Sequence, residues 1–462
     1  MHDDSRGLSV TTTSVSAIAQ LDGTITEYLA LGRNTGAYLK ATFTEDPELA
    51  LAHILKGYFF QLFYKPTLTQ RAASCLALAD NSIKNRGATD REILHRDALA
   101  AWIKGDTEYA TRTWENILDR FPLDVLALRL SHFTHFYDGN SKEMRASLER
   151  VLPAWTSDTP DYGYILGCHA FGLEETGDYQ AAEKLGRKAI DLNPQDPWAV
   201  HAVAHVMEMQ GRHHEGIVWL DQLETNWKSA NAFAGHVAWH RTLFLLEAGQ
   251  FSKVLDLYDQ EVRSDPTSDD YLDIANAASL LWRLHLDGID VGTRWKDLAE
   301  IAATRISDQS LVFADLHYLL TFCGAERHDL ITTMLATMAE ASLKTTTSHG
   351  QVTQQVGLTL GQAMAAIASK DWVSAIALLQ SREESLPLIG GSNAQRDLFA
   401  RLLLYAALAA KNIPLAQTLL RQRLEKNPQS GWAWRRQAEL LHSLNDDIGA
   451  AAAQKKPQAQ TS

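Results

Sequence analysis

The chain has 462 residues, an ordinary apolar content of 45% and a formal net charge of −13. Its 43 basic residues form no run or stripe, which argues against nucleic acid as the main partner, and no apolar run reaches the roughly 18 residues of a membrane span. The acidic, polar start is unlike a secretory signal, and the three distant cysteines do not suggest a disulfide framework. We therefore expect a folded cytoplasmic protein without a nucleic-acid or membrane partner.

In chain order, residues 1–14 are expected to be a flexible N-terminus. From about residue 15 the pattern is helical almost throughout, and no segment shows sustained period-two alternation, so little or no strand is expected. Residues 15–100 predict helical pairs without clean repeat marks, which we interpret as an N-terminal helical cap. Residues 101–445 carry a repeat, and residues 446–462 are expected to be a flexible C-terminal tail.

The repeat consists of a short turn containing glycine, followed by an amphipathic helix. The turn glycines are Gly105, Gly139, Gly177, Gly211, Gly249 and Gly288, and successive ones lie 34, 38, 34, 38 and 39 residues apart. Lys370 and Lys411 begin turns of the same form without glycine. Helix, turn and helix in about 34 residues is the tetratricopeptide pattern, in which hairpins stack because one hairpin cannot bury its apolar face alone. The predicted fold class is an all-α tetratricopeptide-like superhelix, an α-solenoid that is closed or strongly curved.

Four long stretches of the sequence are more specific than a generic tetratricopeptide repeat requires. They are HAFGLEETGDYQAAEKLGRKAIDLNPQDPWAVHAVAHVMEMQGRHHEGIVWL, HVAWHRTLFLLEAGQFSKVLDLYDQ, SLLWRLHLDGIDVGTRW and GGSNAQRDLF. Through them the chain resembles the tetratricopeptide-repeat protein 38 family over about residues 40–440. The resemblance implies an all-helical repeat fold in a soluble, intracellular protein. It implies no catalytic or binding residue, because none is established for that family.

The first helix of each tetratricopeptide unit lines the concave surface of the superhelix. When the turn glycine is counted as position 15, positions 2, 5, 9 and 12 point into the groove. The side chains that this count predicts for a ligand site are Tyr164, Phe171, Glu174, Trp198, His201, His205, Glu208, His236, Trp239, Trp282 and His285. Four neighbouring first helices would thus bring aromatic, imidazole and carboxylate groups to one cavity, as in many small-ligand sites.

Residues 197–211 form the centre of this prediction. His201, His205 and Glu208 are spaced i, i+4 and i+7, which places them on one stripe of a helix. Pro197 suits the first turn of that helix and Gly211 suits its end.

The first functional hypothesis is a binding module that holds a small molecule or a short peptide in the groove. Trp198, Trp239 and Trp282 would offer apolar faces that also attract cations. Glu174 and Glu208 would then favour a cationic group on the ligand. No resident cofactor is required by this hypothesis.

The second hypothesis is an enzyme that uses the same groove. His201, His205 and Glu208, with His236 or His240 as a further ligand, could hold a divalent metal ion, although the sequence is not the HExxH motif. Without a metal, Glu174 or Glu208 could act with His201 or His205 as general acid and base.

The third hypothesis is a protein-interaction scaffold, the usual role of this repeat. The predicted inner positions lack the Lys, Arg and Asn that hold a peptide carboxylate in chaperone-type repeats, which disfavours it. Arg396, in the polar run Gln395–Arg396–Asp397, belongs either to a salt-bridged joint between repeats or to the far wall of the cavity, where it could hold an anion. A homo-oligomer is compatible with the sequence.

Overall fold

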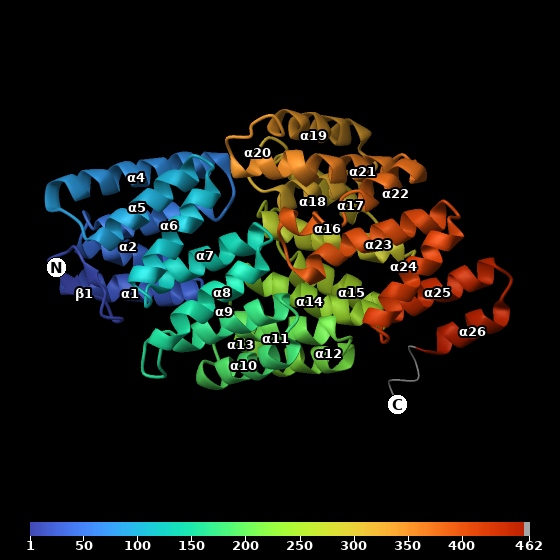
Figure 1. Cartoon of the computed structure of the whole chain (residues 1–462), viewed down its shortest axis with the longest axis horizontal. Coiled ribbons are helices and arrows are strands. Elements are labelled where there is room, and N and C mark those ends of the chain that lie inside the picture. Colours follow the sequence, from blue (N-terminus) through green and yellow to red (C-terminus); the bar gives the residue numbers. More distant parts are fainter. Residues whose placement is uncertain (457–462) are drawn as a thin grey trace.

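The structure, a computed structural model, describes residues 1–456 as antiparallel helix pairs stacked into a superhelix (Figure 1). The first helices of the pairs are α1 (Val15–Leu29), α3 (Ala50–Gln61), α5 (Asp90–Ile103), α7 (Val125–Tyr137), α9 (Tyr162–Glu175), α11 (Pro197–Met209), α14 (Phe233–Glu247), α16 (Tyr271–Leu286), α18 (Val312–Gly324), α21 (Leu358–Ala368), α23 (Asn393–Ala409) and α25 (Gly431–Ser443). The second helices are α2 (Thr35–Glu45), α4 (Pro66–Arg86), α6 (Thr107–Arg120), α8 (Ser141–Val151), α10 (Tyr179–Leu192), α12 (His213–Gln222), α15 (Phe251–Leu257), α17 (Arg294–Ala303), α19 (His328–Ala341), α22 (Trp372–Gln380), α24 (Ile413–Lys426) and α26 (Asp447–Lys455). The predicted all-α tetratricopeptide-like superhelix is therefore confirmed.

Short helical segments join or extend these pairs. They are the 3-10 turns η1 (Leu152–Ala154) and η4 (Leu386–Ile389), the short α-helices α13 (Glu224–Trp227) and α20 (Ser348–Val352), and the π-helical turns η2 (Tyr258–Val262) and η3 (Thr353–Gly357). Within residues 1–456, none of the helices combines the length and the apolar character that crossing a membrane requires.

The turn between paired helices has one backbone geometry along the chain. Gly177 has a φ of +85°, and the next residue, Asp178, caps α10 by accepting a hydrogen bond from a backbone amide of its first turn. Lys370 and Lys411 take the same left-handed conformation, with φ of +60° and +54°, and an Asp or Asn cap follows each. The hairpin geometry therefore forms even where a side chain adds about 1–2 kcal/mol of strain.

Both ends of the chain contain structure where flexibility was expected. Strands β1 (His2–Asp3) and β2 (Ser9–Val10) pair antiparallel. Between them, buried Arg6 forms ion pairs with Asp4, with Asp22 of α1 and with Asp161, which precedes α9. At the other end α26 occupies residues 447–455, and the rest of the expected tail, residues 457–462, lies outside the described residues.

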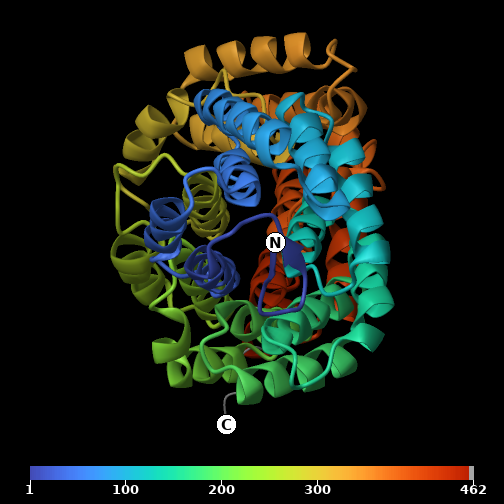
Figure 2. The same cartoon turned by 90° about the vertical axis from the view of Figure 1, so that its left-hand side faces the viewer.

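The superhelix returns on itself, so that segments far apart in the sequence are in contact. Helices surround the N-terminal pairs in Figure 2, and the amide of Asn231 donates a hydrogen bond of 2.7 Å to the carbonyl of Leu31. On the opposite wall, a Cβ at Gly139, in the α7–α8 turn, would lie 1.9 Å from the carbonyl oxygen of Pro387. The amide of Ser348 donates to the carbonyl of Gly105 in the same region. These contacts close the coil into a ring.

Replacing Gly139 by Ala tests this closure. Gly139 has a φ of +69°, and an added Cβ would strike the main chain at Pro387, so we expect a loss of unfolding free energy clearly greater than the cost of the φ alone. Gly177 is the matched control, because it occupies the same turn position at φ +85° with no atom within 4 Å of an added Cβ. Gly177→Ala should cost about 1–2 kcal/mol in urea unfolding. Equal losses in the two variants would contradict the closed ring.

Candidate functional site

A largely apolar cavity of about 500 Å³ lies inside the ring. Its aromatic lining includes Tyr28, Phe59, Phe133, Phe136, Phe171, Trp198, Phe233 and Tyr271. The N-terminal helices thus supply one wall, while α7, α9, α11, α14 and the start of α16 supply the others. A cavity of this size and lining is typical of small-molecule sites.

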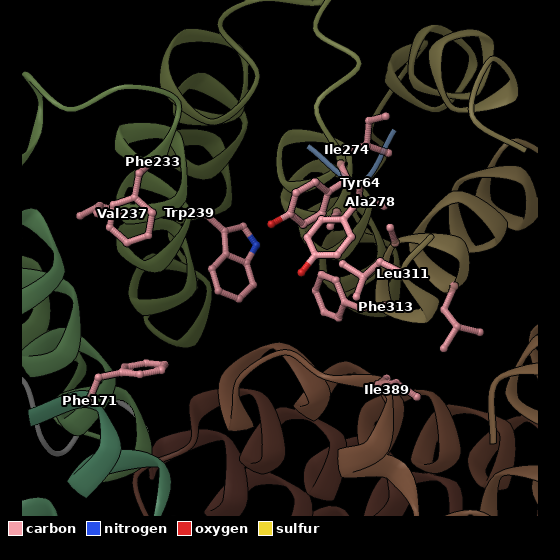
Figure 3. Close-up of a cluster of buried hydrophobic side chains, with 14 of the residues drawn as sticks. Tyr64, Phe171, Phe233, Val237, Trp239, Ile274, Ala278, Leu311, Phe313 and Ile389 are labelled. Atoms are coloured by element: carbon pink, nitrogen blue, oxygen red, sulfur yellow. The ribbon is translucent and has the colours of Figure 1, made fainter. Parts of the chain in front are cut away.

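Imidazoles from α11 and α14 form one end of the cavity. Asp196 caps α11, and Pro197 follows as its first residue, so the helix begins where the sequence predicted. His201 and His205 then lie one turn apart on the inner face of α11, and His236 reaches the same point from α14. Figure 3 shows Phe171 of α9 together with Phe233 and Trp239 of α14 in the apolar layer beside them.

Four histidines make one buried cluster, which we call the histidine cluster: His201, His205, His236 and His240. The Nε2 atom of His201 lies 2.9 Å from Nε2 of His205 and 3.1 Å from Nε2 of His236. One ring nitrogen from each of the four residues lies within 4.8 Å of the others. The rings of His205 and His240 have centroids 4.3 Å apart.

Polar groups behind the cluster orient its rings. His240 Nδ1 lies 2.8 Å from the Glu208 carboxylate, and His236 Nδ1 lies 2.9 Å from Asn276 Oδ1 of α16. His205 Nδ1 faces Glu174 at 3.5 Å and Glu175 at 4.0 Å. Since carboxylate and amide oxygens accept hydrogen bonds, these contacts place the ring hydrogens of His236 and His240 on Nδ1 and leave a lone pair on each Nε2.

Burial sets the protonation of the site. It lowers the pKa of His236 to about 3 and holds those of His201 and His240 well below the ordinary value, so the imidazoles are neutral at pH 7. Burial also raises the pKa of Glu174 to about 8 and that of Glu208 to about 7. The site therefore keeps proton acceptors and proton donors in contact near neutral pH.

A second cavity, of about 310 Å³, lies on the other side of the histidine cluster and has several charged residues in its lining. Glu208 lines it together with Arg283 of α16 and Asp397, Arg401 and Arg423 of the C-terminal helices. Arg283 is buried with 1% of its surface exposed, and within the described chain no carboxylate lies close enough to form an ion pair with it. The cluster thus separates an apolar cavity from a charged one.

Several of the predicted site residues come together in the structure. Phe171, Trp198, His201, His205 and His236 line the apolar cavity. Glu174, Glu208 and Trp239 lie behind its surface: Glu174 beside His205, Glu208 beside His240, and Trp239 stacked on His236 with ring centroids 5.4 Å apart. Glu208 shares one stripe of α11 with His201 and His205, as predicted, but it contacts the cluster through His240 and does not line the apolar cavity.

The other predicted residues lie elsewhere. Tyr164 packs half-buried near Asn193, whose hydrogen bond partly offsets the burial that raises the tyrosine pKa to about 12. Trp282 donates to the carbonyl of Leu320 and packs between helices, and His285 is exposed at the surface of α16. The α16 residues that reach the site, Asn276 and Arg283, are each one position later than the count predicts, and one residue rotates a side chain by about 100° on a helix.

Arg396 belongs to a joint between distant repeats rather than to the apolar cavity. Its guanidinium lies 3.4 Å from the Glu175 carboxylate and 2.9 Å from Asn393 Oδ1. Glu175 also accepts a hydrogen bond of 2.9 Å from the backbone amide of Asn393. This is the salt-bridged alternative left open by the sequence, and it fastens the start of α23 to the end of α9.

Sequence reasoning missed the N-terminal wall, Asn276, Glu175 and Arg283. Residues before 100 show no repeat marks, so no count placed Tyr28 or Phe59 at the site. A signal did exist for His240, because HVAWH repeats the i, i+4 spacing of His201 and His205 on the next first helix.

The chain is similar to several solved structures. No protein-family model matches the chain. Among solved structures, it is similar to a human IFIT1 dimer with PPP-AAAA, at 13% identity and a TM-score of 0.42, with 96% of this chain and 94% of that chain covered. A human IFIT1 dimer with m7Gppp-AAAA gives 14% identity and a TM-score of 0.41, with 96% of each chain covered. The TPR domain of P58(IPK) gives 13% identity and a TM-score of 0.22, with 81% of this chain and 94% of that chain covered.

Its stacked helix pairs make the chain a tetratricopeptide-like helical-repeat protein. At these identities the likeness concerns the fold alone.

The expectation that nucleic acid is excluded as a partner is wrong, because the similar IFIT1 structures hold capped or triphosphate RNA. The expectation rested on basic residues that are scattered in the linear sequence. In a superhelix, residues far apart in the sequence can lie on one inner wall. Arg283, Arg401 and Arg423, for example, all line the second cavity.

Proposed function

We propose that this protein binds a small, mainly apolar molecule in the aromatic cavity inside the ring. The observation that carries the proposal is the aromatic lining of a volume of about 500 Å³, with neutral imidazoles at one end. Apolar walls supply the binding energy, and His201, His205 and His236 supply hydrogen-bonding groups that would orient one polar end of the ligand. The predicted cationic ligand is less favoured, because Glu174 and Glu208 do not line this cavity.

The covered concave face disfavours an extended protein partner. Helix α23 and the start of α25 already pack there: Arg283 donates to the carbonyl of Ala394, and the Glu247 carboxylate accepts from the amide of Trp432. A scaffold role would therefore use the outer surface. We also propose that the chain belongs to the tetratricopeptide-repeat protein 38 family, which the four sequence stretches support.

A variant at the cavity mouth tests the binding site. Gly36, in the first turn of α2, lines the cavity, and a Cβ added there meets no atom within 4 Å. We expect Gly36→Phe to weaken binding of the neutral fluorescent probe N-phenyl-1-naphthylamine at least about tenfold, or roughly 1.4 kcal/mol, by occupying the mouth. Gly36→Ala is the matched control and should bind the probe like the unmodified chain.

The same titration distinguishes other ligands. Probe binding that Gly36→Phe leaves unchanged would contradict the proposed cavity. Displacement of the probe by a 5′-triphosphate oligonucleotide, with no displacement by neutral apolar compounds, would replace the small molecule by an RNA end as the ligand.

Acid–base catalysis in the same cavity is the second candidate function. It is favoured by the contact of His240 with Glu208 at 2.8 Å and of His205 with Glu174 at 3.5 Å, because each joins a neutral imidazole to a carboxyl group that burial keeps partly protonated. His205 alone of these four lines the cavity. For this second function, His205→Gln should abolish turnover of a bound compound while reducing its binding much less, because the apolar walls remain.

A further inference from the structure

One ring nitrogen from each residue of the histidine cluster lies within 4.8 Å of the others, close enough for the four imidazoles to converge on one metal ion. Neighbouring nitrogens at metal–nitrogen distances of about 2.0–2.1 Å are about 3.0 Å apart at right angles and about 3.3 Å apart in a tetrahedron. The Nε2 separations of 2.9 and 3.1 Å around His201 fall at the short end of this range. Helix α11 supplies His201 and His205, and α14 supplies His236 and His240. Because both pairs are spaced i, i+4, each helix presents its two imidazoles on one face.

Hydrogen bonding within the cluster does not satisfy all of these nitrogens. Asn276 holds Nδ1 of His236 and leaves its Nε2 beside His201, and Glu208 holds Nδ1 of His240 and leaves its Nε2 available to a ligand. His201 carries one ring hydrogen when neutral, and its Nε2 lies beside two other Nε2 atoms. In the described part of the chain, His240 Nε2 has no hydrogen-bond partner and is buried. A cation at the centre would satisfy all four lone pairs together.

The surroundings match the outer shell of a protein metal site. Metal-bound histidines usually donate their second N–H to a carboxylate, a carbonyl or water, which fixes the ring and raises its basicity. His240 has Glu208 in that place, His236 has the Asn276 amide oxygen, and His205 faces Glu174 and Glu175. These carboxylates would also balance the charge of a divalent ion held by neutral imidazoles.

We propose that His201, His205, His236 and His240 bind one divalent first-row transition-metal ion of the zinc type through one ring nitrogen each. Imidazole ligands suit zinc, copper, iron and nickel, whereas calcium and magnesium prefer oxygen. His201, His205 and His236 line the apolar cavity, so a molecule bound there would meet the ion at one end. The metal site does not depend on that molecule, because its ligands and outer partners all come from α9, α11, α14 and α16.

The test uses the full chain, treated with a chelator, dialysed and titrated with Co²⁺ and then with Zn²⁺ in competition with a chromophoric chelator. We expect one equivalent of each ion and visible d–d absorption from Co²⁺ that His201→Gln and His236→Gln abolish. Zn²⁺ should raise the unfolding temperature of the unmodified chain but not that of His201→Gln. His317→Gln is the matched control, because His317 is a buried histidine of α18 outside the cluster, and this variant should bind like the unmodified chain.

Glu208→Gln keeps the four ligands and changes only the partner of His240. This variant should weaken Zn²⁺ binding about 10–100-fold, while the circular dichroism of the metal-free protein stays unchanged. It therefore still tests the metal site if a variant of one of the four histidines does not fold. Binding of less than a tenth of an equivalent by the unmodified chain, or equal binding by His201→Gln and His317→Gln, would overturn the proposal. Probe binding to metal-free protein and its response to Gly36→Phe are measured separately, so the cavity and the metal site can fail independently.

Discussion

Replacing Arg401 by Met is expected to lower the free energy of unfolding by about 3–5 kcal/mol, because it leaves the buried Glu247 carboxylate without a cation, while Asp397 keeps its ion pair with Arg423. The Arg401 guanidinium lies 2.7 Å from Glu247 and 2.7 Å from Asp397, and it stacks on the ring of Trp432 at 4.5 Å. Met retains much of the stem that packs on Trp432, so the loss reports on charge rather than on volume. Urea unfolding followed by circular dichroism measures it.

The control for Arg401→Met is a cation in an exposed pair. Arg112 lies 3.6 Å from Glu108 on α6, and both side chains are about 70% exposed. Arg112→Met should change the unfolding free energy by about 0.5 kcal/mol or less. A loss below about 1 kcal/mol for Arg401→Met would show that this network contributes no more than a surface pair.

Replacing Glu247 by Gln is expected to lower the free energy of unfolding by an amount that depends on pH. Burial alone would raise the pKa of Glu247, but the Arg401 guanidinium and the Trp432 amide outweigh it and lower the pKa to about 2. The unfolded value is about 4.5, so the folded state binds fewer protons between these limits. The carboxylate thus contributes stability above pH 4.5 that is lost as the pH falls toward 2, and the pKa difference corresponds to about 3 kcal/mol.

Urea unfolding at intervals from pH 7 to pH 3 measures this penalty. We expect Glu247→Gln to be about 3 kcal/mol less stable than the unmodified chain above pH 5 and the difference to shrink by pH 3. In the Arg401→Met background the same substitution should cost little at any pH, because the cation that lowers the pKa is gone. A difference that does not vary with pH would rule out Glu247 as the titrating group.

The part of the fold that local sequence patterns determine could be predicted. Glycine turns, Asp caps and amphipathic periodicity are properties of neighbouring residues, and they correctly gave the stacked hairpins. The pairs His201 with His205 and His236 with His240 follow from helical spacing alone. The repeat count brought Phe171, Trp198, His201, His205 and His236 together, because α9, α11 and α14 belong to consecutive hairpins.

The part that long-range packing determines could not be predicted. The face that α16 turns inward depends on α23, whose Ala394 carbonyl lies 2.8 Å from Arg283, more than 100 residues earlier in the chain. Similarly, the wall at Tyr28 and Phe59 depends on how the N-terminal pairs dock inside the ring. No periodicity within a single hairpin encodes either arrangement.

Closure of the ring also has a consequence for biosynthesis. The chain leaves the ribosome from the N-terminus, so the wall at Tyr28 is made long before Phe233 and Tyr271, with which it encloses the cavity. The joint of Glu175 with Asn393 and of Glu247 with Trp432 can form only when the last hairpins have been translated. Truncated chains of this protein should therefore expose the aromatic side chains of the incomplete cavity to chaperones. An open array of the same hairpins could instead fold one repeat at a time.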